Sequence, residues 1–226
     1  MGTDNLFHKR KLSKKCSARK KRNLRDPYKK ILIVSEGKKT EPHYFTGLRD
    51  YYALNTANVR VTGDSQSAPS KVLDYARQKY REERDMGDAY DMVFCVFDKD
   101  THACYERTKN DILNASPKNT FYAITSVPCF EFWLLLHFVR KDMPYEATGG
   151  RSAADNVVKD LKNYLIEYEK NKKDIFREVS HLVDNAIHNS ESVLRGAKKH
   201  DSDNPSTNAH ELVYVLKNLN KTEIND

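Results

Sequence analysis

Two short runs of the chain are apolar at every position, as expected of strands that are covered on both faces of an α/β sheet. The first runs from Ile31 to Val34 and the second from Met92 to Phe97. Weaker strand patterns lie at residues 58–62 and 120–125. Helical stretches separate these runs, and strands that alternate with helices favour a mostly parallel sheet with right-handed crossovers.

Apolar residues recur at intervals of three and four between the predicted strands, which is the period of an α-helix. One helix is predicted to begin at Thr40 as its N-cap, with Pro42 tolerated in the first turn. Further helices are predicted over about 70–86 and about 104–114. The pattern therefore predicts an α/β fold with a sheet of about four strands flanked by helices.

The C-terminal third is predicted to be helical. Residues 130–138 are nearly all apolar and indicate a buried helix, which the sequence Thr148-Gly149-Gly150 separates from the later helices. These are expected over about 153–170, over 175–199 with a break near Asn189, and over 206–219. We therefore divide the chain into a basic arm (1–27), an α/β core (28–147) and a helical C-terminal extension packed on the core (148–226).

The positive charge of the chain is concentrated at its N-terminus. The formal net charge is +7, and the first thirty residues carry twelve Lys or Arg against two Asp. This segment has too few clustered apolar residues to offset the entropy lost on folding, so we expect a mobile cationic arm. Its residues Lys20, Lys21 and Arg22 could neutralise the phosphates of a nucleic acid. A tail that only increases solubility would have the same composition.

Other features of the sequence exclude several classes of protein. No apolar run approaches the roughly 20 residues of a membrane-spanning helix, and the N-terminus lacks the apolar stretch of a secretion signal. We therefore expect a cytoplasmic protein without a membrane partner. The four cysteines include no Cys-x-x-Cys pair, so reduced thiols are expected rather than disulfides or a thiolate zinc site.

Carboxylates follow the two strongest strands directly. Glu36 follows the first strand, and Asp98 and Asp100 end the second. The carboxyl ends of parallel strands share one edge, where ligands bind, and residues two apart in an extended segment share a side. If the strands are neighbours, three negative charges meet and need a cation. Oxygen ligands suit Mg²⁺ or Mn²⁺ better than zinc, although Asp-x-Asp after a strand can equally be a turn or a helix cap.

A divalent cation at such a site would serve phosphoryl transfer, because its remaining coordination positions take water and substrate phosphates. Glu36 stands slightly apart from the two aspartates and would be free to move a proton. The residues alone therefore suggest phosphate chemistry at the edge of the sheet.

The same residues resemble those of a known domain. A strand followed by Glu36-Gly37, with Asp98-Lys99-Asp100 some sixty residues later, is similar to the TOPRIM domain of topoisomerases, primases and overcoming-lysogenization-defect nucleases. More closely, the chain resembles the RloB-like proteins over about residues 28–220. The motifs that carry this resemblance are Ile33 to Pro42, Val96 to Asp100, Ser126 to Phe138 and Pro205 to Val213. It implies a TOPRIM-like, Rossmann-like core.

RloB-like proteins occur in mobile defence loci of bacteria and archaea, typically beside an ATPase. The resemblance implies a magnesium-dependent nuclease, the effector of an anti-phage, abortive-infection system that works with this ATPase partner. It makes Glu36 the acid/base and Asp98 and Asp100 the magnesium ligands. The alternative is a non-catalytic subunit that binds nucleic acid or a partner. RNA and DNA both remain open as the substrate, and an oligomer is possible.

Two further acidic residues are candidates for the same site. Glu131 lies in an apolar helix, and a lone buried carboxylate costs several kcal/mol unless it is neutralised. We therefore weigh a further catalytic or acidic role at the metal site against a salt bridge to a basic residue. Glu41 stands at a helix start and is expected to interact with the helix dipole rather than with metal.

The remaining candidates are basic. Lys38, Lys39 and Lys99 are candidates for binding nucleic acid. Lys38 and Lys39 could hold a scissile phosphate, and the alternative for Lys99 is that it only relieves the repulsion between the aspartates that flank it. His210 matches a recurrent position of the RloB-like pattern and could reach the site if its helix packs over the strand ends. His137 follows Glu131 by six residues and is expected on a different face of the helix.

Overall fold

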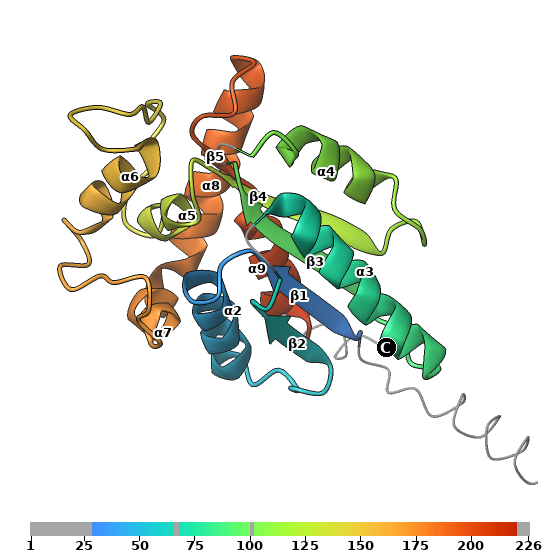
Figure 1. The fold of residues 1–226 in the computed structure, drawn as a ribbon. Coiled ribbons are helices and arrows are strands. Elements are labelled where there is room, and N and C mark those ends of the chain that lie inside the picture. The colour runs from blue at the N-terminus through green and yellow to red at the C-terminus, as the bar shows by residue number, and fades with distance from the viewer. Residues whose placement is uncertain (1–28, 66–67, 100–101, 221–226) are drawn as a thin grey trace, which may run out of the picture.

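The computed structural model describes residues 29–65, 68–99 and 102–220 (Figure 1). The expected metal ligand Asp100 and the basic residues Lys20, Lys21 and Arg22 lie outside the described residues. Within them, five strands form one sheet in the order β2-β1-β3-β4-β5. The α/β class with a mostly parallel, Rossmann-like sheet is confirmed.

The four predicted strands form the parallel part of the sheet. Strand β1 (Ile31–Ser35) pairs with β2 (Val59–Thr62) on one side and with β3 (Met92–Asp98) on the other. Strand β4 (Phe121–Val127) pairs with β3, and the short β5 (Ser206–Thr207) runs antiparallel to the end of β4. Because β1 and β3 are neighbours, the residues that follow them meet at one edge.

Helices cover both faces of the sheet, which explains why β1 is apolar throughout. Ile31 and Ile33 pack into a hydrophobic cluster on one face, and Leu32 and Val34 pack into a second cluster on the other. Helices α3 (Pro69–Asp85) and α4 (Tyr105–Leu113) cover the second face. Helix α2 (Thr40–Tyr51) lies on the first face, together with α9 (Ala209–Asn218) (Figure 1).

The part of the chain after β4 differs from the prediction in four places. The buried helix is only α5 (Glu131–Leu135), and α6 (Ala153–Leu161) ends well before residue 170. The break expected near Asn189 is wrong: α7 (Ile175–Val179) passes through a 3₁₀ turn (Ser180–Leu182) into an unbroken α8 (Val183–Lys199). Residues 206 and 207 form β5 rather than the start of a helix, because they pair with β4.

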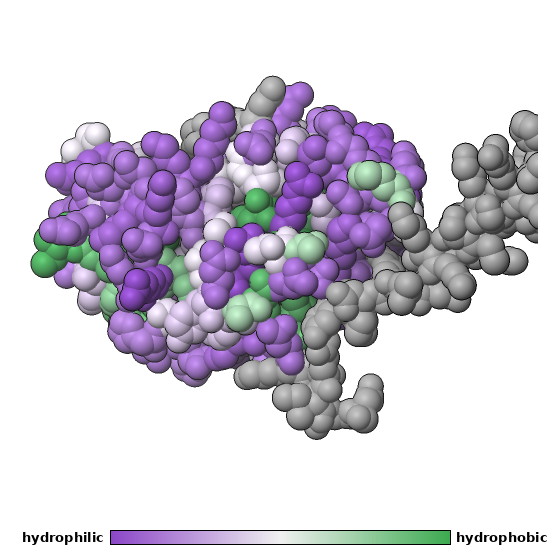
Figure 2. Space-filling model, turned by 90° about the horizontal axis from the view of Figure 1, so that it is seen from below, coloured by the Kyte–Doolittle hydropathy of each residue, from purple (hydrophilic) through white to green (hydrophobic). Residues whose placement is uncertain are grey.

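Helix α6 ends early because the chain beyond it makes tertiary contacts that a continuous helix would prevent. The Tyr168 hydroxyl donates a hydrogen bond to Glu131, and the carbonyl oxygen of Lys170 accepts one from Thr40. No helix among the described residues is long and apolar enough to cross a membrane. The face seen in Figure 2 is mostly hydrophilic, with small groups of hydrophobic residues between the hydrophilic ones.

Gly63, directly after β2, supports the loop that leads from β1 into α2. A Cβ at Gly63 would lie 2.5 Å from the carbonyl oxygen of Gly37 and 2.9 Å from the Cα of Lys38. Both atoms belong to the backbone, so they cannot move aside as the end of a flexible side chain would. The backbone of the loop that carries Glu36 therefore packs directly against Gly63, where a side chain would leave no room for it.

We predict that Gly63→Ala lowers the free energy of unfolding by about 1–3 kcal/mol, because overpacking forces the backbone to shift. The matched control is Gly196→Ala in α8, where an added Cβ would meet nothing within 4 Å and should raise stability by about 0.5–1 kcal/mol. Urea unfolding curves of the two variants measure both effects. Equal stabilities of the two variants would show that the loop does not rest on Gly63.

Candidate functional site

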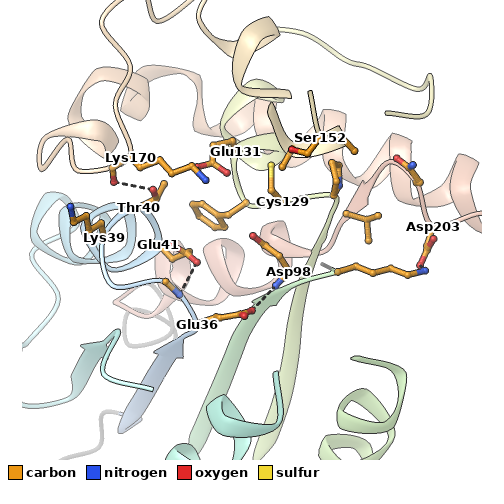
Figure 3. Close-up of a pocket in the computed structure, with 18 of the residues that line it drawn as sticks. Glu36, Lys39, Thr40, Glu41, Asp98, Cys129, Glu131, Ser152, Lys170 and Asp203 are labelled. Carbon is orange, nitrogen blue, oxygen red and sulfur yellow. Dashed lines mark hydrogen bonds and ion pairs between the residues drawn. The ribbon is translucent and has the colours of Figure 1, made fainter. Parts of the chain in front are cut away.

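A cavity of about 1090 Å³ lies at the carboxyl edge of the sheet (Figure 3). Its lining comes from segments that are far apart in the sequence: the loop after β1, the end of β3, the connection from β4 to α5, and the C-terminal extension. Parallel strands with connecting helices place their loops at this edge, where ligands of α/β proteins collect.

The structure brings two of the expected acidic residues together in this cavity. Glu36 follows β1 and Asp98 ends β3, and both line the cavity. The backbone amide of Asp98 donates a hydrogen bond of 3.4 Å to Oε2 of Glu36. This contact follows from the register, in which Ser35 pairs with Val96. His102, which the sequence did not single out, places its Nε2 3.7 Å from Oε1 of Glu36.

Glu41 adds a third carboxylate from the first turn of α2. It is only 7% exposed, and its Oε1 accepts a hydrogen bond of 3.2 Å from the backbone amide of Gly37. A Cβ at Gly37 would collide with this carboxylate, so the glycine after Glu36 is needed for Glu41 to pack. Its position at the helix start is as expected. The prediction that it interacts with the dipole alone misses its place in the wall of the cavity.

Glu131, the first residue of α5, is 3% exposed and joins Glu36, Asp98 and Glu41 as the fourth carboxylate of this group. Asp203 also lines the cavity but is paired with Lys99. Its Oε1 accepts a hydrogen bond of 3.0 Å from the Tyr168 hydroxyl and lies 3.7 Å from Nζ of Lys170. Of the alternatives weighed from the sequence, the salt bridge to a basic residue is present, and a role at a metal site stays a prediction. Glu131 faces the acidic cavity and is also paired with a basic residue.

The four carboxylates affect one another electrostatically. Burial raises the pKa of Glu41 to about 7, and the charges of Glu131 and Glu36 add to the effect. Burial also raises the pKa of Asp98 well above its usual range, again with help from the neighbouring glutamates. Both directions have the same cause: a carboxylate loses water and gains negative neighbours, so its charged form becomes unfavourable.

The basic candidates take different positions. Lys38 and Lys39 are exposed and line the cavity. Lys99 also lines it, but its Nζ lies 2.5 Å from Oδ2 of Asp203. This ion pair, which the sequence did not predict, ties the end of β3 to the turn before β5. The effect of Lys99 on its flanking aspartates stays a prediction, since Asp100 lies outside the described residues. Lys170, which the sequence analysis missed, holds the position beside Glu131 (Figure 3).

The histidines singled out from the sequence do not line the cavity. His210 lies in α9, and its Nδ1 is 2.8 Å from the Ser190 hydroxyl. His137 is buried on the same face of the sheet as α2, 3.2 Å from the Tyr44 hydroxyl. Burial lowers the pKa of His137 to about 4, so this side chain is neutral at physiological pH and serves the core.

The donor set of the cavity suits a hard divalent cation, since carboxylate oxygens are the ligands that Mg²⁺ and Mn²⁺ prefer. In the parts of the chain that the structure describes, no group of three or more His, Cys, Asp or Glu side chains is already close enough to hold a metal ion. Burial raises the pKa of the neighbouring Cys129 thiol, so this sulfur is protonated and a poor ligand.

The sequence pattern that defines RloB-like proteins matches residues 31–216 of the chain. The chain belongs to the RloB-like family. The match spans every cavity residue from Glu36 to Asn204, so the carboxylates, Lys170 and the walls from the C-terminal extension all lie inside the family region of this RloB-like protein. Comparisons with curated proteins and with solved structures gave no match.

The raised pKa of Glu41 predicts how the stability of this RloB-like protein depends on pH. The pKa is about 7 in the folded state against an ordinary value of 4.5, so the folded protein retains a proton that the unfolded chain has lost. The stability contributed by this carboxyl is complete below about pH 4.5 and is lost as the pH rises through 7.

Glu41→Gln removes this titration. In a buffer with a chelator, we predict that the variant gains about 2–3 kcal/mol relative to wild type between about pH 5 and pH 8. Urea unfolding at several pH values measures the difference. Glu167→Gln is the matched control, because Glu167 is exposed and does not line the cavity. Parallel pH profiles for Glu41→Gln and wild type would contradict the repulsion among the carboxylates.

Proposed function

We propose that this RloB-like protein is a magnesium-dependent nuclease with a TOPRIM-type site, cleaving phosphodiester bonds in RNA or DNA. The observation that carries the proposal is the group formed by Glu36, Glu41, Asp98 and Glu131 in one cavity, with exposed lysines at its rim. The resemblance to defence proteins extends the proposal. It makes the chain the cytoplasmic effector of an anti-phage, abortive-infection system that works with an ATPase partner.

The cation would be held by Glu36, Asp98 and Asp100, with Glu41 and Glu131 as the other acidic groups of the cavity. When bound, a divalent cation polarises the phosphoryl group and lowers the pKa of a coordinated water. The carboxylates alone are an unfavourable arrangement, since burial and mutual repulsion raise the pKa of Glu41 and of Asp98. Added positive charge would restore the charged form of each side chain.

The other groups of the cavity would position the phosphate and move protons. The Glu36 side chain is 14% exposed and lies beside His102, so it is accessible enough to take or give a proton, and we assign it the acid/base role. The Lys170 side chain is 66% exposed while its Nζ lies 3.7 Å from Glu131. It can reach a phosphate at the rim without leaving the carboxylates.

The N-terminal end of α2 also faces the cavity, because Lys39 and Thr40 both line it. Unpaired backbone amides at the start of a helix attract phosphate oxygens. The exposed ammonium groups of Lys38 and Lys39 add positive charge at the same place. The chain therefore offers acidic groups for a cation and basic groups for the phosphates on either side of it.

The test is cleavage of labelled RNA and DNA pools by the full chain, with Mg²⁺ or Mn²⁺ and with a chelator, alone and with the ATPase encoded nearby. We predict metal-dependent cleavage of at least one pool. Glu36→Gln should slow it at least about 100-fold, as expected when a general acid/base is lost, while nucleic-acid binding stays unchanged. The exposed Glu167→Gln should cleave like wild type.

Two results would contradict the nuclease. The first is the absence of cleavage by wild type under all of these conditions. The second is equal cleavage by Glu36→Gln and wild type, which would place the reaction elsewhere. Nucleic-acid binding without cleavage would favour the alternative, a binding subunit whose partner performs the reaction.

A further inference from the structure

The carboxylates of the cavity lie below its rim. Glu41 and Glu131 are 7% and 3% exposed, whereas Lys39, Ser152 and Lys170 are exposed. All five residues line the same cavity (Figure 3). A phosphate that reaches the carboxylates must therefore pass between exposed rim residues into the interior of the cavity.

The rim comes from separate parts of the chain. Lys38 and Lys39 belong to the loop before α2, and Ser152 is the N-cap of α6. Lys170 follows α6, and Asp203 belongs to the turn before β5. Two contacts hold these parts in place: Thr40 bonds to the carbonyl oxygen of Lys170, and Lys99 pairs with Asp203. The rim is thus built into the fold on several sides.

The size of the cavity favours a narrow substrate. The volume of about 1090 Å³ is close to that of pockets for small molecules, about 300–1,000 Å³, and the carboxylates Glu41 and Glu131 are nearly buried beneath the exposed rim. A double helix therefore has no room to bring a backbone phosphate down to Glu41 and Glu131. A single strand has that room, because its backbone is free of a partner and can bend into the cavity.

The remaining lining suits an unpaired nucleotide. Beside the charged groups, the wall includes small apolar residues, which are Val127, Pro128, Ala147, Ala153 and Ala154. A base in a duplex hides its faces in the stack, whereas an unpaired base presents a flat apolar face to such a wall. Lys39 and Lys170 lie on adjoining segments of the rim, because Thr40 bonds to the carbonyl oxygen of Lys170. Their ammonium groups are placed to meet a phosphate next to the buried one.

We propose that the cavity of this protein takes single-stranded nucleic acid, and that its rim excludes duplexes from the carboxylates. This inference rests on the proposed nuclease function and specifies the form of its substrate. RNA and DNA strands share the backbone chemistry that the rim recognises, so the experiment includes both.

The test maps where nucleic acid touches the full chain. Strands of RNA and of DNA carry a photoreactive thiopyrimidine in the middle, either unpaired or within a blunt duplex of the same sequence. They are cross-linked in Ca²⁺ and the attached peptides are identified. We expect peptides with cavity residues, such as those containing Lys170 or Ala154, to be labelled at least tenfold more by a single strand than by its duplex.

Ala154→Trp fills part of the cavity wall and should reduce labelling of these peptides at least tenfold. Ala57→Trp is the control, because Ala57 is exposed and lies in the turn before β2, outside the cavity lining. Duplex labelling elsewhere on the chain should be the same in both variants. If Ala154→Trp fails to fold, the inference is still tested by comparing how strongly single strand and duplex label the cavity peptides of wild type.

Equal labelling of cavity peptides by duplex and single strand would overturn the inference, and so would a failure of single strands to label them. Cleavage in Mg²⁺ separates this inference from the proposed function. Labelling of the cavity by single strands without any cleavage would contradict the nuclease and leave the strand preference standing. Cleavage of duplexes at the same rate as single strands would support the nuclease and contradict the strand preference.

Discussion

Electrostatic repulsion among carboxylates that the fold holds in one cavity is the constraint on which the rest of the site depends. Strands β1 and β3 are neighbours, so Glu36 and Asp98 meet at the carboxyl edge of the sheet, and α2 and α5 add Glu41 and Glu131. Burial raises the pKa of Glu41 and of Asp98, and the neighbouring charges raise it further. Such perturbed groups in a cavity are typical of functional sites. The repulsion is the physical reason to assign a cation to this place.

The C-terminal extension both encloses the carboxylates and offsets part of their charge. The segment after α6 sends the Tyr168 hydroxyl and the Lys170 ammonium to Glu131, and its backbone binds Thr40 at the start of α2. The same segment forms part of the rim of the cavity. Residues that contact Glu131 therefore also line the entrance that the proposed substrate would use. In this account, charge compensation and selection of the substrate depend on one piece of the chain.

The features of the site that depend on the strands could be predicted from the sequence, whereas the positions of residues that tertiary contacts determine could not. The convergence of Glu36 and Asp98 could be read from two apolar runs that end in carboxylates, because parallel strands share their carboxyl edge. Lys170 could not be found, because Leu161, Leu165 and Tyr168 continue a helical spacing although the helix ends at Leu161. The apolar period there reflects packing of these residues against the hydrophobic cluster, and the Tyr168 hydroxyl in addition bonds to Glu131. The partner of Lys99 was equally hidden, since Asp203 lies a hundred residues away in a turn.

Thermal unfolding with and without magnesium tests the central claim most directly. In a chelator, Asp98→Asn should melt above wild type, with a gain of about 1 kcal/mol from the charge removed, and Asp74→Asn on the exposed side of α3 should melt like wild type. Millimolar Mg²⁺ should raise the melting temperature of wild type and of Asp74→Asn, because the folded state alone binds it, and leave Asp98→Asn unchanged. A wild-type protein that responds to neither Mg²⁺ nor Mn²⁺ would contradict the account.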